Sequence, residues 1–318
     1  MLRLRRLALL LAALAPAAGA QQALEPDRDD GVPPGWMIIE GDIQVPQDFY
    51  LSPSPFATNF WPGGDVPYVF HSSVGAGRQA LAIAAMEEWE TQAHLDFHPR
   101  NGEPNYIVWR DSGQNSSAIG MIPGGQTINI VSWNTHYTIM HEIGHALGYW
   151  HTHASEDRDQ YVQINYDNVC QTCCGGSCNG NFNIIFGSKR YGPYNFDSFM
   201  HYGQFQASGN GMETITVLPP NDVEWQDVIG QRDHMSVWDG RLMSFLYPEP
   251  DWLFVDWSDA TSTETGEFFD PYLDFWQAVN AVPTGGQVIV KEPDPAIAPG
   301  TIDRAMTLRA PMGGVVIR

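Results

Sequence analysis

The chain has 318 residues, 43% of them hydrophobic and 12% aromatic, which allows roughly two globular domains of the usual ~100 to 200 residues each. Its 37 Asp and Glu outnumber 16 Lys and Arg, and the formal net charge is -21. Because binding to a phosphate backbone needs a basic surface that releases counterions, this charge argues against nucleic acid as a partner. Gly and Pro are plentiful, which favours a loop-rich α+β fold over a helical bundle.

Residues 1–20 predict a secretory signal peptide. Arg3, Arg5 and Arg6 form a basic start, a Leu/Ala run follows, and Ala18-Gly19-Ala20 is a small-residue cleavage site. The run is too short to cross a bilayer, and no other apolar stretch is long enough. We therefore expect a secreted protein, extracellular or periplasmic, with no membrane span. An uncleaved anchor is the alternative, but no Cys near the cleavage site could carry a lipid.

The next segment, up to about Pro55, is polar, rich in proline and poor in periodicity, so its composition predicts a loose leader. Residues 66–133 then predict a helix backed onto a mixed sheet. Apolar or alternating runs at 66–70, 106–109 and 127–131 indicate strands. Residues 77–92 have the spacing of an amphipathic helix, and the side chains expected to face the core are Leu81, Ala84, Ala85 and Trp89.

The stretch HEIGHALGYWH begins at His141 and carries the most specific chemistry of the chain. His145 lies four residues later, so on a helix the two imidazoles share a face, with Glu142 beside them. Gly148 follows where helices commonly end in a left-handed residue, and the reversed chain can return His151 toward the other two. Three imidazoles with an open fourth position are the ligand set of catalytic zinc, whereas structural zinc usually has four ligands rich in Cys. The alternative is a buried amphipathic helix with hydrogen-bonded core histidines.

A methionine turn follows at Ser198-Phe199-Met200-His201-Tyr202-Gly203. Together with the histidine motif and its continuation, Asp157-Arg158-Asp159-Gln160-Tyr161-Val162-Gln163-Ile164, it closely resembles the astacin family of zinc metallopeptidases, which are metzincins. The resemblance runs from about residue 39 to residue 248. It includes Trp61-Pro62-Gly63-Gly64 with Pro67-Tyr68, and Ile229-Gly230-Gln231-Arg232 ahead of Asp239 and Tyr247. The chain is similar to a secreted, bacterial-type member with a carboxyl-terminal extension.

The resemblance implies an α+β catalytic domain at 52–250, with two lobes around a zinc cleft and a sheet edge that pairs with extended substrates. One Zn²⁺ per subunit would be held by His141, His145 and His151. Tyr202 would be a weak fifth ligand that swings away to stabilise the transition state, and Met200 an apolar floor under the metal. Taken singly, Met200 could be an ordinary core residue and Tyr202 a half-buried phenol.

Catalysis is expected to depend on Glu142. Zinc would lower the pKa of a bound water toward ~7 and polarise the scissile carbonyl. Glu142 would take the proton from this water and deliver it to the leaving amine, a general acid-base role that contributes ~10²- to 10⁴-fold. The expected substrates are proteins or peptides.

Ile39-Glu40-Gly41-Asp42 resembles the Phe-x-Gly-Asp element of astacin propeptides, with Ile in place of Phe. Residues 21–51 would then be a propeptide in which Asp42 reaches the metal, displaces the catalytic water and holds a latent zymogen, while Gly41 lets the backbone come close. The alternative is a surface turn with a solvated acid. By spacing from Trp61 the mature chain starts near Ser52, and the absence of Lys and Arg between Asp30 and Gly77 argues against activation by a trypsin-like enzyme.

Two departures from the family pattern carry predictions. Thr152 stands where astacins usually place the Glu that anchors the freed amino terminus, so that anchor is not expected here. Family members that prefer an acidic side chain just after the scissile bond present a basic residue in the segment after the methionine turn. This chain has no Lys or Arg between Tyr202 and Arg232, so we predict a small or apolar preference; the residues in question are Val217, Leu218, Pro219 and Pro220.

Two neighbouring features carry simpler predictions. His153 is expected to point away from the metal, beside the ligands or at the surface. The cluster Asp157-Arg158-Asp159 predicts a buried or partly buried salt-bridge knot between the lobes, with calcium binding as the alternative.

The four cysteines fall in one Gly-rich insertion: Cys170, Cys173, Cys174 and Cys178. The positions that commonly carry family disulfides hold His94, Gln114 and Trp133 instead. In an exported protein four cysteines predict two disulfides, for which three connectivities exist, and the adjacent Cys173 and Cys174 are expected to pair with Cys170 and Cys178 rather than with each other. A second zinc site is the alternative.

Residues 251–318 predict a small β-rich extension. A short helix near 275–279 and brief strands within 283–290, 306–309 and 313–317, divided by glycines, resemble the first coil of a right-handed parallel β-helix. The extension could bind another protein or a glycan, or cover the protease. The sequence thus predicts a secreted, latent zinc endopeptidase. The alternative is an extracellular binding or adhesion protein that keeps the metal fold for structure.

Overall fold

The computed structural model describes residues 31–47, 49, 59–172, 177–185, 191–259, 262–291 and 297–311. Its largest sheet has seven strands in the order β1-β2-β6-β7-β5-β3-β4. In chain order these are β1 (Trp36–Ile39), β2 (Ile43–Pro46), β3 (Asp65–Phe70), β4 (Asp96–Pro99), β5 (Tyr106–Asp111), β6 (Ser116–Ala118) and β7 (Gly125–Ile130). Four of them, β7, β5, β3 and β4, run parallel, whereas β6 is antiparallel to β7. The sheet is therefore mixed, and β3, β5 and β7 confirm the three predicted strands.

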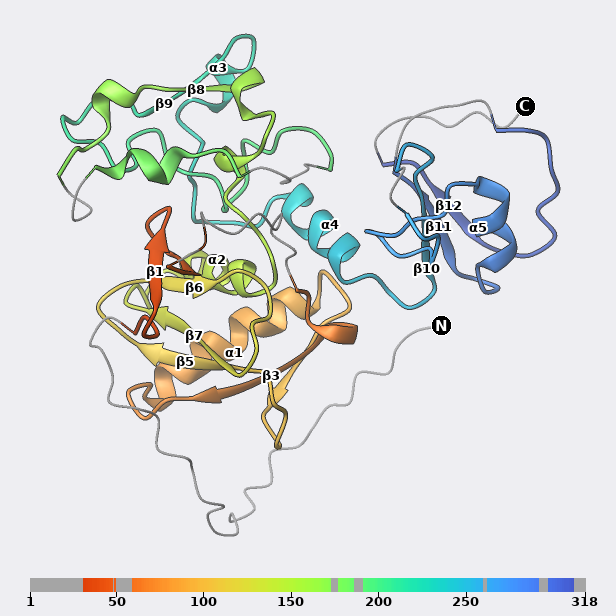
Figure 1. The fold of residues 1–318 in the computed structure, drawn as a ribbon, viewed down its shortest axis with the longest axis horizontal. Coiled ribbons are helices and arrows are strands. Elements are labelled where there is room, and N and C mark those ends of the chain that lie inside the picture. Colours follow the sequence, from red (N-terminus) through yellow and green to blue (C-terminus); the bar gives the residue numbers. More distant parts are fainter. Residues whose placement is uncertain are drawn as a thin grey trace.

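Two helices, α1 (Ala76–Glu90) and α2 (His136–Ala146), pack on each other and against this sheet (Figure 1). The inward face of α1 consists of Ala82, Ala85, Met86 and Trp89. The prediction that Leu81 and Ala84 face the core is wrong, since both are exposed. One residue turns a helix by about 100°, so an error of one position in an Ala-rich segment moves the apolar face toward solvent.

Residues 31–47 are ordered, so the prediction of a loose leader is wrong for this part. Strands β1 and β2 form an antiparallel hairpin, and β2 pairs in parallel with β6 at the edge of the large sheet. The apolar side chains of Ile39, Ile43 and Val45 are buried in a small cluster with Phe49. The ladder of β6 and the packing surface beside it stabilise a hairpin that composition alone does not predict.

The second lobe follows α2 and is built mostly of short turns and loops (Figure 1). Its only described strands, β8 (Val162–Ile164) and β9 (Ile215–Val217), pair antiparallel. A cluster of aromatic and aliphatic side chains forms its core, including Phe182, Tyr194 and Tyr202. The remaining short helices are η2 (Pro62–Gly64), η3 (Thr152–Ala154), η4 (Arg158–Gln160), η5 (Tyr166–Asn168), η6 (Cys178–Phe182) and α3 (Asp222–Trp225).

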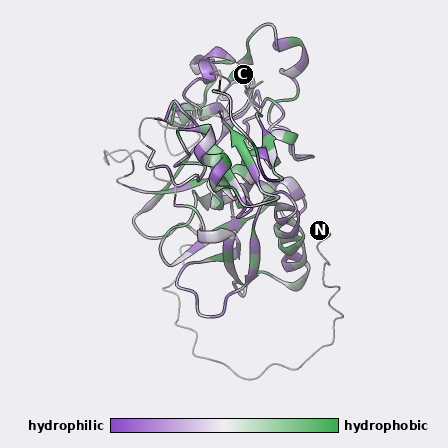
Figure 2. Cartoon of the chain, turned by 90° about the vertical axis from the view of Figure 1, so that its right-hand side faces the viewer, coloured by the Kyte–Doolittle hydropathy of each residue, from purple (hydrophilic) through white to green (hydrophobic). Residues whose placement is uncertain are grey.

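Helix α4 (Val237–Leu246) leads to a separate carboxyl-terminal unit (Figure 1). There β10 (Trp252–Val255), β11 (Gln287–Val290) and β12 (Thr307–Arg309) form a parallel sheet, and α5 (Phe275–Ala281) connects the first two strands. The strands of this unit include its most hydrophobic segments (Figure 2). The predicted β-rich extension with parallel strands is therefore present.

The carboxyl-terminal unit packs on the rest of the protein through aromatic side chains. Phe245 of α4 stacks on Phe268, with ring centroids 5.7 Å apart, and Phe269 stacks on Phe60 at 5.0 Å.

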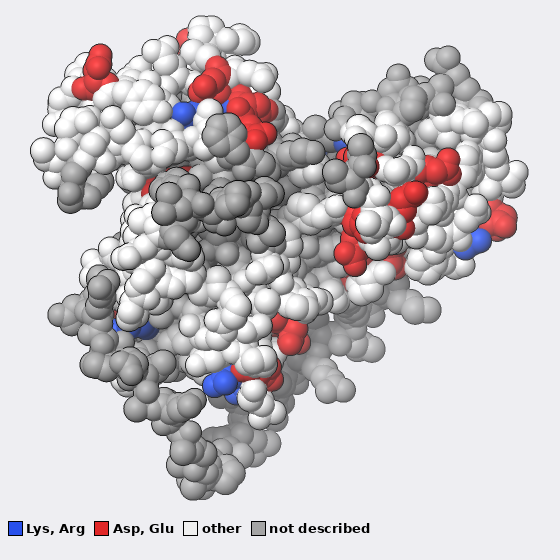
Figure 3. All heavy atoms as spheres, viewed as in Figure 1, with Lys and Arg blue, Asp and Glu red and all other residues white. Residues whose placement is uncertain are grey.

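Acidic side chains gather on this unit and on the second lobe in the face that Figure 3 shows. Within the described part of the chain no helix is both long and apolar enough to cross a membrane, and the predicted signal peptide lies outside that part.

Candidate active site

Helix α2 positions the first two histidines of the motif. His141 and His145 lie one turn apart and are both buried. Gly144 lies between them, and a Cβ there would come within 3.0 Å of the sulfur of Met200. After the helix ends, Gly148 adopts the left-handed conformation (φ 111°), as predicted, and the chain reverses to bring back His151.

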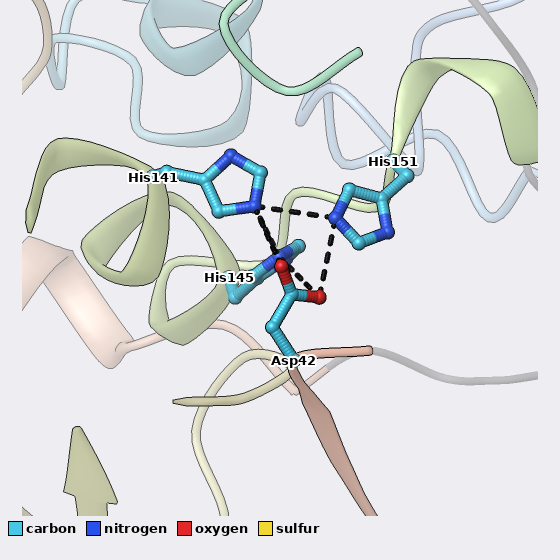
Figure 4. Close-up of side chains that lie close together, drawn as sticks. All are labelled: Asp42, His141, His145 and His151. Atoms are coloured by element: carbon cyan, nitrogen blue, oxygen red, sulfur yellow. Dashed lines mark hydrogen bonds and ion pairs between the residues drawn. The ribbon is translucent and has the colours of Figure 1, made fainter. Parts of the chain in front are cut away.

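The three imidazoles converge through their Nε2 atoms (Figure 4). Nε2 of His141 lies 3.1 Å from Nε2 of His145 and 3.2 Å from Nε2 of His151. The Nδ1 atoms point outward to acceptors. His141 donates to the carbonyl of Phe199 (2.9 Å), His145 to that of Tyr149 (2.7 Å), and His151 to the Glu40 carboxylate (2.7 Å). With each Nδ1 protonated, three Nε2 lone pairs face one small space.

Asp42 enters this space from the turn between β1 and β2 (Figure 4). Its Oδ2 lies 3.3 Å from Nε2 of His141, and its Oδ1 lies 3.3 Å from Nε2 of His151 and 3.8 Å from Nε2 of His145. The four ligand atoms all lie within 4.8 Å of one another. The structure thus brings together the carboxylate and the three histidines, which come from segments about 100 residues apart.

This donor set fits a zinc ion. Two zinc–nitrogen bonds of ~2.0–2.1 Å at a tetrahedral angle separate their nitrogens by about 3.3 Å, close to the observed spacings. Asp42 Oδ1 is buried yet accepts no hydrogen bond, which leaves it free to bind a cation. Each outward Nδ1–H has a partner that fixes its ring, the usual support of metal-binding histidines.

The electrostatics of the site keep His141 and His145 neutral and favour a positive charge on His151 beside the ionised carboxylate of Asp42. Burial lowers the pKa of His141 to about 4 and that of His145 well below its usual value. Burial also acts on His151, but the charges of Asp42 and Glu40 outweigh it and raise its pKa to about 9. Burial opposes ionisation of Asp42, yet His151 and His141 hold its pKa well below the usual range. The cluster therefore stabilises positive charge at its centre.

Glu142 is the other acid of the motif and is buried beside the histidines on α2. Burial and the negative charge of Asp42 raise its pKa well above the usual value, while Arg232 opposes them. Its Oε2 accepts no hydrogen bond. A buried carboxyl with a raised pKa is suited to accept and return a proton.

Tyr202 lies next to the third histidine. Its ring is 4.7 Å from that of His151 and stacks on His153 at 3.9 Å. Its hydroxyl donates to the backbone carbonyl of Glu40. His153 is fully buried and donates from Nε2 to the carbonyl of Asn181, so it supports Tyr202 and is not among the metal-binding group. The prediction that it points away from the metal is confirmed, and it lies inside the protein rather than at the surface.

The methionine turn is fixed by Asp239 on α4. Asp239 caps its own helix by accepting from the N–H of Ser236, and it also accepts from the hydroxyl of Ser198 (2.5 Å) and the N–H of Phe199 (3.3 Å). Met200 is fully buried, and its carbonyl accepts from the N–H of Thr152 at 3.1 Å. One buried carboxylate of α4 thus holds the methionine turn in place.

We expect Asp239→Ala to lower the free energy of unfolding by about 2–4 kcal/mol, because several buried donors lose their acceptor together. Urea denaturation of the metal-free protein measures this change. Glu224→Ala, at an exposed position in the first turn of α3, is the control and should change stability by less than ~0.5 kcal/mol. Equal, small losses for both variants would refute the role given to Asp239.

With this geometry established, comparisons with known proteins identify the family. The family model described as Astacin (peptidase family M12A) matches residues 55–248, more than half of the chain. The chain belongs to the astacin family. The resemblance of the motifs and the predicted fold class are thereby confirmed, and so is the single zinc ion of the catalytic domain.

Individual relatives agree with this assignment. Nematocyst expressed protein 6 from Nematostella vectensis is 32% identical over 196 residues, which cover 59% of this chain and 64% of that protein. Meprin A subunit beta from Rattus norvegicus is 33% identical over 219 residues, covering 67% of this chain and 30% of the relative. The solved structure of high choriolytic enzyme 1, a hatching enzyme zinc-protease from Oryzias latipes, aligns with 31% identity and a TM-score of 0.51, over 60% of this chain and 94% of that one. The match thus spans less than two thirds of the length of the first two relatives and most of the solved hatching-enzyme chain.

Two minor predictions concern the cluster Asp157-Arg158-Asp159, for which we expect a salt-bridge knot or, as the alternative, calcium binding. Arg158 is buried and pairs with Asp159 at 2.9 Å, but the Asp159 side chain is 68% exposed, so this pair lies partly at the surface. No second group of acids, histidines or cysteines suited to a metal occurs among the described residues, which leaves the calcium alternative without support there.

The cysteine insertion is described only in part. Cys170 and Cys178 are buried, neither is a free thiol, and the N–H of Cys178 donates to the carbonyl of Cys170. Cys173 and Cys174 lie outside the described residues, so the pairing stays a prediction.

Two residues of the site were not singled out from the sequence. Glu40 occupies the variable position of the propeptide element, and only its contact with His151 reveals a role. Arg232 is recognisable as part of a motif, but its partly buried position near the site is a property of the fold. Its guanidinium donates to the carbonyl of His201, and its charge acts on Glu142 and Asp42.

Proposed function

We propose that this astacin is a secreted zinc-dependent endopeptidase that is made as a latent zymogen. The observation that carries the proposal is the convergence of three buried Nε2 atoms on one space, with the buried Glu142 carboxyl on the same helix. A purely structural metal site would not need an unpartnered acid with a raised pKa.

In this proposal His141, His145 and His151 hold the metal. Bound zinc would supply a Lewis acid that lowers the pKa of a water ligand and polarises the scissile carbonyl. Glu142 takes a proton from that water and returns it to the amine of the departing peptide, since its carboxyl is buried, free of partners and raised in pKa. Tyr202, once released from Glu40, can donate its hydroxyl hydrogen to the negative charge that develops on the former carbonyl oxygen.

Latency is proposed to arise from three contacts of residues 31–47. Asp42 lies among the histidines, where the catalytic water would have to sit. Strand β2 occupies the edge of the sheet by pairing with β6, an edge that an extended substrate would otherwise use. The hydroxyl of Tyr202 is held by the carbonyl of Glu40. Removal of the propeptide would break all three contacts at once.

Hydrolysis of casein tests the function. Protein freed of the residues before about Ser52 should cleave casein, lose that activity with a zinc chelator and regain it on addition of Zn²⁺. The unprocessed chain should be much less active in the same assay. Activity that survives complete metal removal, or a metal-loaded processed chain with no activity on any protein, would overturn the proposal.

We also predict a small or apolar side chain just after the scissile bond. No Lys or Arg occurs between Tyr202 and Arg232, so the second lobe offers no basic partner from that segment. Near β9 it presents Leu218 and the exposed Pro219 and Pro220. Mass spectrometry of products from a peptide library would measure the preference, and a dominant Asp at that position would refute it.

Export and disulfides complete the proposal. The basic start and small-residue cleavage site at 1–20 support secretion. An oxidising compartment would then allow the four clustered cysteines to pair, in line with the lack of free thiols at Cys170 and Cys178. A binding role for residues 251–318 stays a prediction.

A further inference from the structure

The three histidines differ in what holds their outer nitrogens. His141 and His145 donate from Nδ1 to backbone carbonyls of Phe199 and Tyr149, and both acceptors belong to the astacin domain itself. His151 donates instead to a carboxylate, that of Glu40, at 2.7 Å. Glu40 precedes the predicted cleavage region, so this one support is lost when the propeptide leaves. The third histidine is therefore the only one whose support depends on the unprocessed state.

Glu40 and Asp42 together enclose His151. Glu40 meets its Nδ1, while Asp42 Oδ1 lies 3.3 Å from its Nε2 on the opposite side of the ring. A turn places both carboxylates there, with Gly41 between them at φ 83°. A Cβ on Gly41 would lie 3.3 Å from the Tyr202 hydroxyl, so the turn fits closely against the domain.

Burying the Glu40 carboxylate in this position destabilises the chain unless a specific interaction offsets the cost. The side chain is 1% exposed, and its second oxygen, Oε1, has no hydrogen-bond partner. The residue also adopts φ 48°, which disfavours any side chain and costs on the order of 1 kcal/mol. A leader that only had to block the site would not require a second buried acid in a strained backbone. A carboxylate that accepts from the outer nitrogen of a metal-binding histidine fixes its tautomer and raises its basicity.

We propose that Glu40 is a positioning residue that builds the zinc site of the unprocessed chain. It holds His151 in the Nδ1–H tautomer with Nε2 directed at the metal. The propeptide that blocks the site therefore also strengthens zinc binding to it. The inference rests on the proposed latency, because it assigns Glu40 to the segment removed on activation. The two can be tested separately, because the zinc affinity of the unprocessed chain does not depend on peptidase activity.

The test compares zinc affinity of full-length variants by competition with a fluorescent chelator. Glu40→Ala should weaken zinc binding by about 10- to 100-fold, the usual effect of removing such a support. Glu40→Gln keeps an acceptor oxygen without the charge and should restore part of the loss. Glu142→Ala is the matched control, because it removes another buried carboxylate beside the same histidines that has no bond to an imidazole nitrogen in the described structure. It reports the loss of a buried acid that supports no imidazole and should weaken zinc binding by only a few-fold.

Folding is followed separately by thermal unfolding of the metal-free variants. If Glu40→Ala and Glu142→Ala weaken zinc equally, or if Glu40→Ala binds zinc within twofold of the parent, the inference is overturned. If Glu40→Ala does not fold without metal, the Gln variant decides, because an affinity equal to that of the parent would then show that the charge of Glu40 is not needed and would overturn the inference that its carboxylate builds the site. Failure of casein hydrolysis in the processed chain would count against the proposed function and would leave these affinities as they are.

Discussion

Replacing Glu142 by Gln in the processed chain is expected to leave zinc bound and to lower casein hydrolysis by ~10²- to 10⁴-fold or more. Gln has nearly the same shape as Glu, so the packing of α2 should survive. It cannot, however, accept a proton from water at neutral pH and return it to the leaving amine. Because Glu142 lies outside the group that converges on the metal, its loss should affect turnover and leave the metal content unchanged.

Two measurements separate this role from a structural one. Zinc content by atomic absorption should match that of the parent, and kcat should fall while KM changes little, because proton transfer occurs in the reaction step. Glu87→Gln, an exposed acid on α1, is the control and should keep full activity. A Glu142→Gln enzyme within tenfold of the parent would assign the proton transfer to another group.

The features that sequence predicted best are those fixed over a short span of chain. The i, i+4 spacing put His141 and His145 on one helical face, and the left-handed Gly148 returned His151, as expected. Both depend only on local geometry and on the chemistry of catalytic zinc. The approach of Asp42 across 99 residues followed from a family motif rather than from spacing.

The features that sequence missed depend on tertiary contacts. Residues 31–47 have little periodicity, yet they form a hairpin because the exposed ladder of β6 offers hydrogen bonds to β2. The inward face of α1 was misplaced because an Ala-rich helix has weak amphipathicity, and Trp89 alone could not fix its rotation. Glu40 had no signal at all, since an acid in a polar leader is ordinary until its burial against His151 is seen.

Replacing Asp42 by Ala is expected to release activity from the unprocessed chain without any cleavage. A carboxylate tethered beside the histidines acts at an effective concentration of the order of mM, so its removal should raise activity on a short fluorogenic peptide by about 10- to 100-fold. Release should stay below that of the processed enzyme. Strand β2 would still pair with β6, and the Ile39, Ile43 and Val45 cluster would still hold the hairpin.

The graded variant Asp42→Asn separates charge from occupancy. Its amide oxygen can still approach the metal, so it should release less activity than Ala does, whereas a simple steric block would make Asn as latent as the parent. Electrophoresis must show the chains uncut during the assay, and the double variant Asp42→Ala with Glu142→Gln should be inactive, which excludes a contaminating protease. If Asp42→Ala stays as latent as the parent but gains full activity once the propeptide is removed, latency depends on the other two contacts, the pairing of β2 with the sheet edge and the bond from Tyr202 to Glu40, and not on the aspartate.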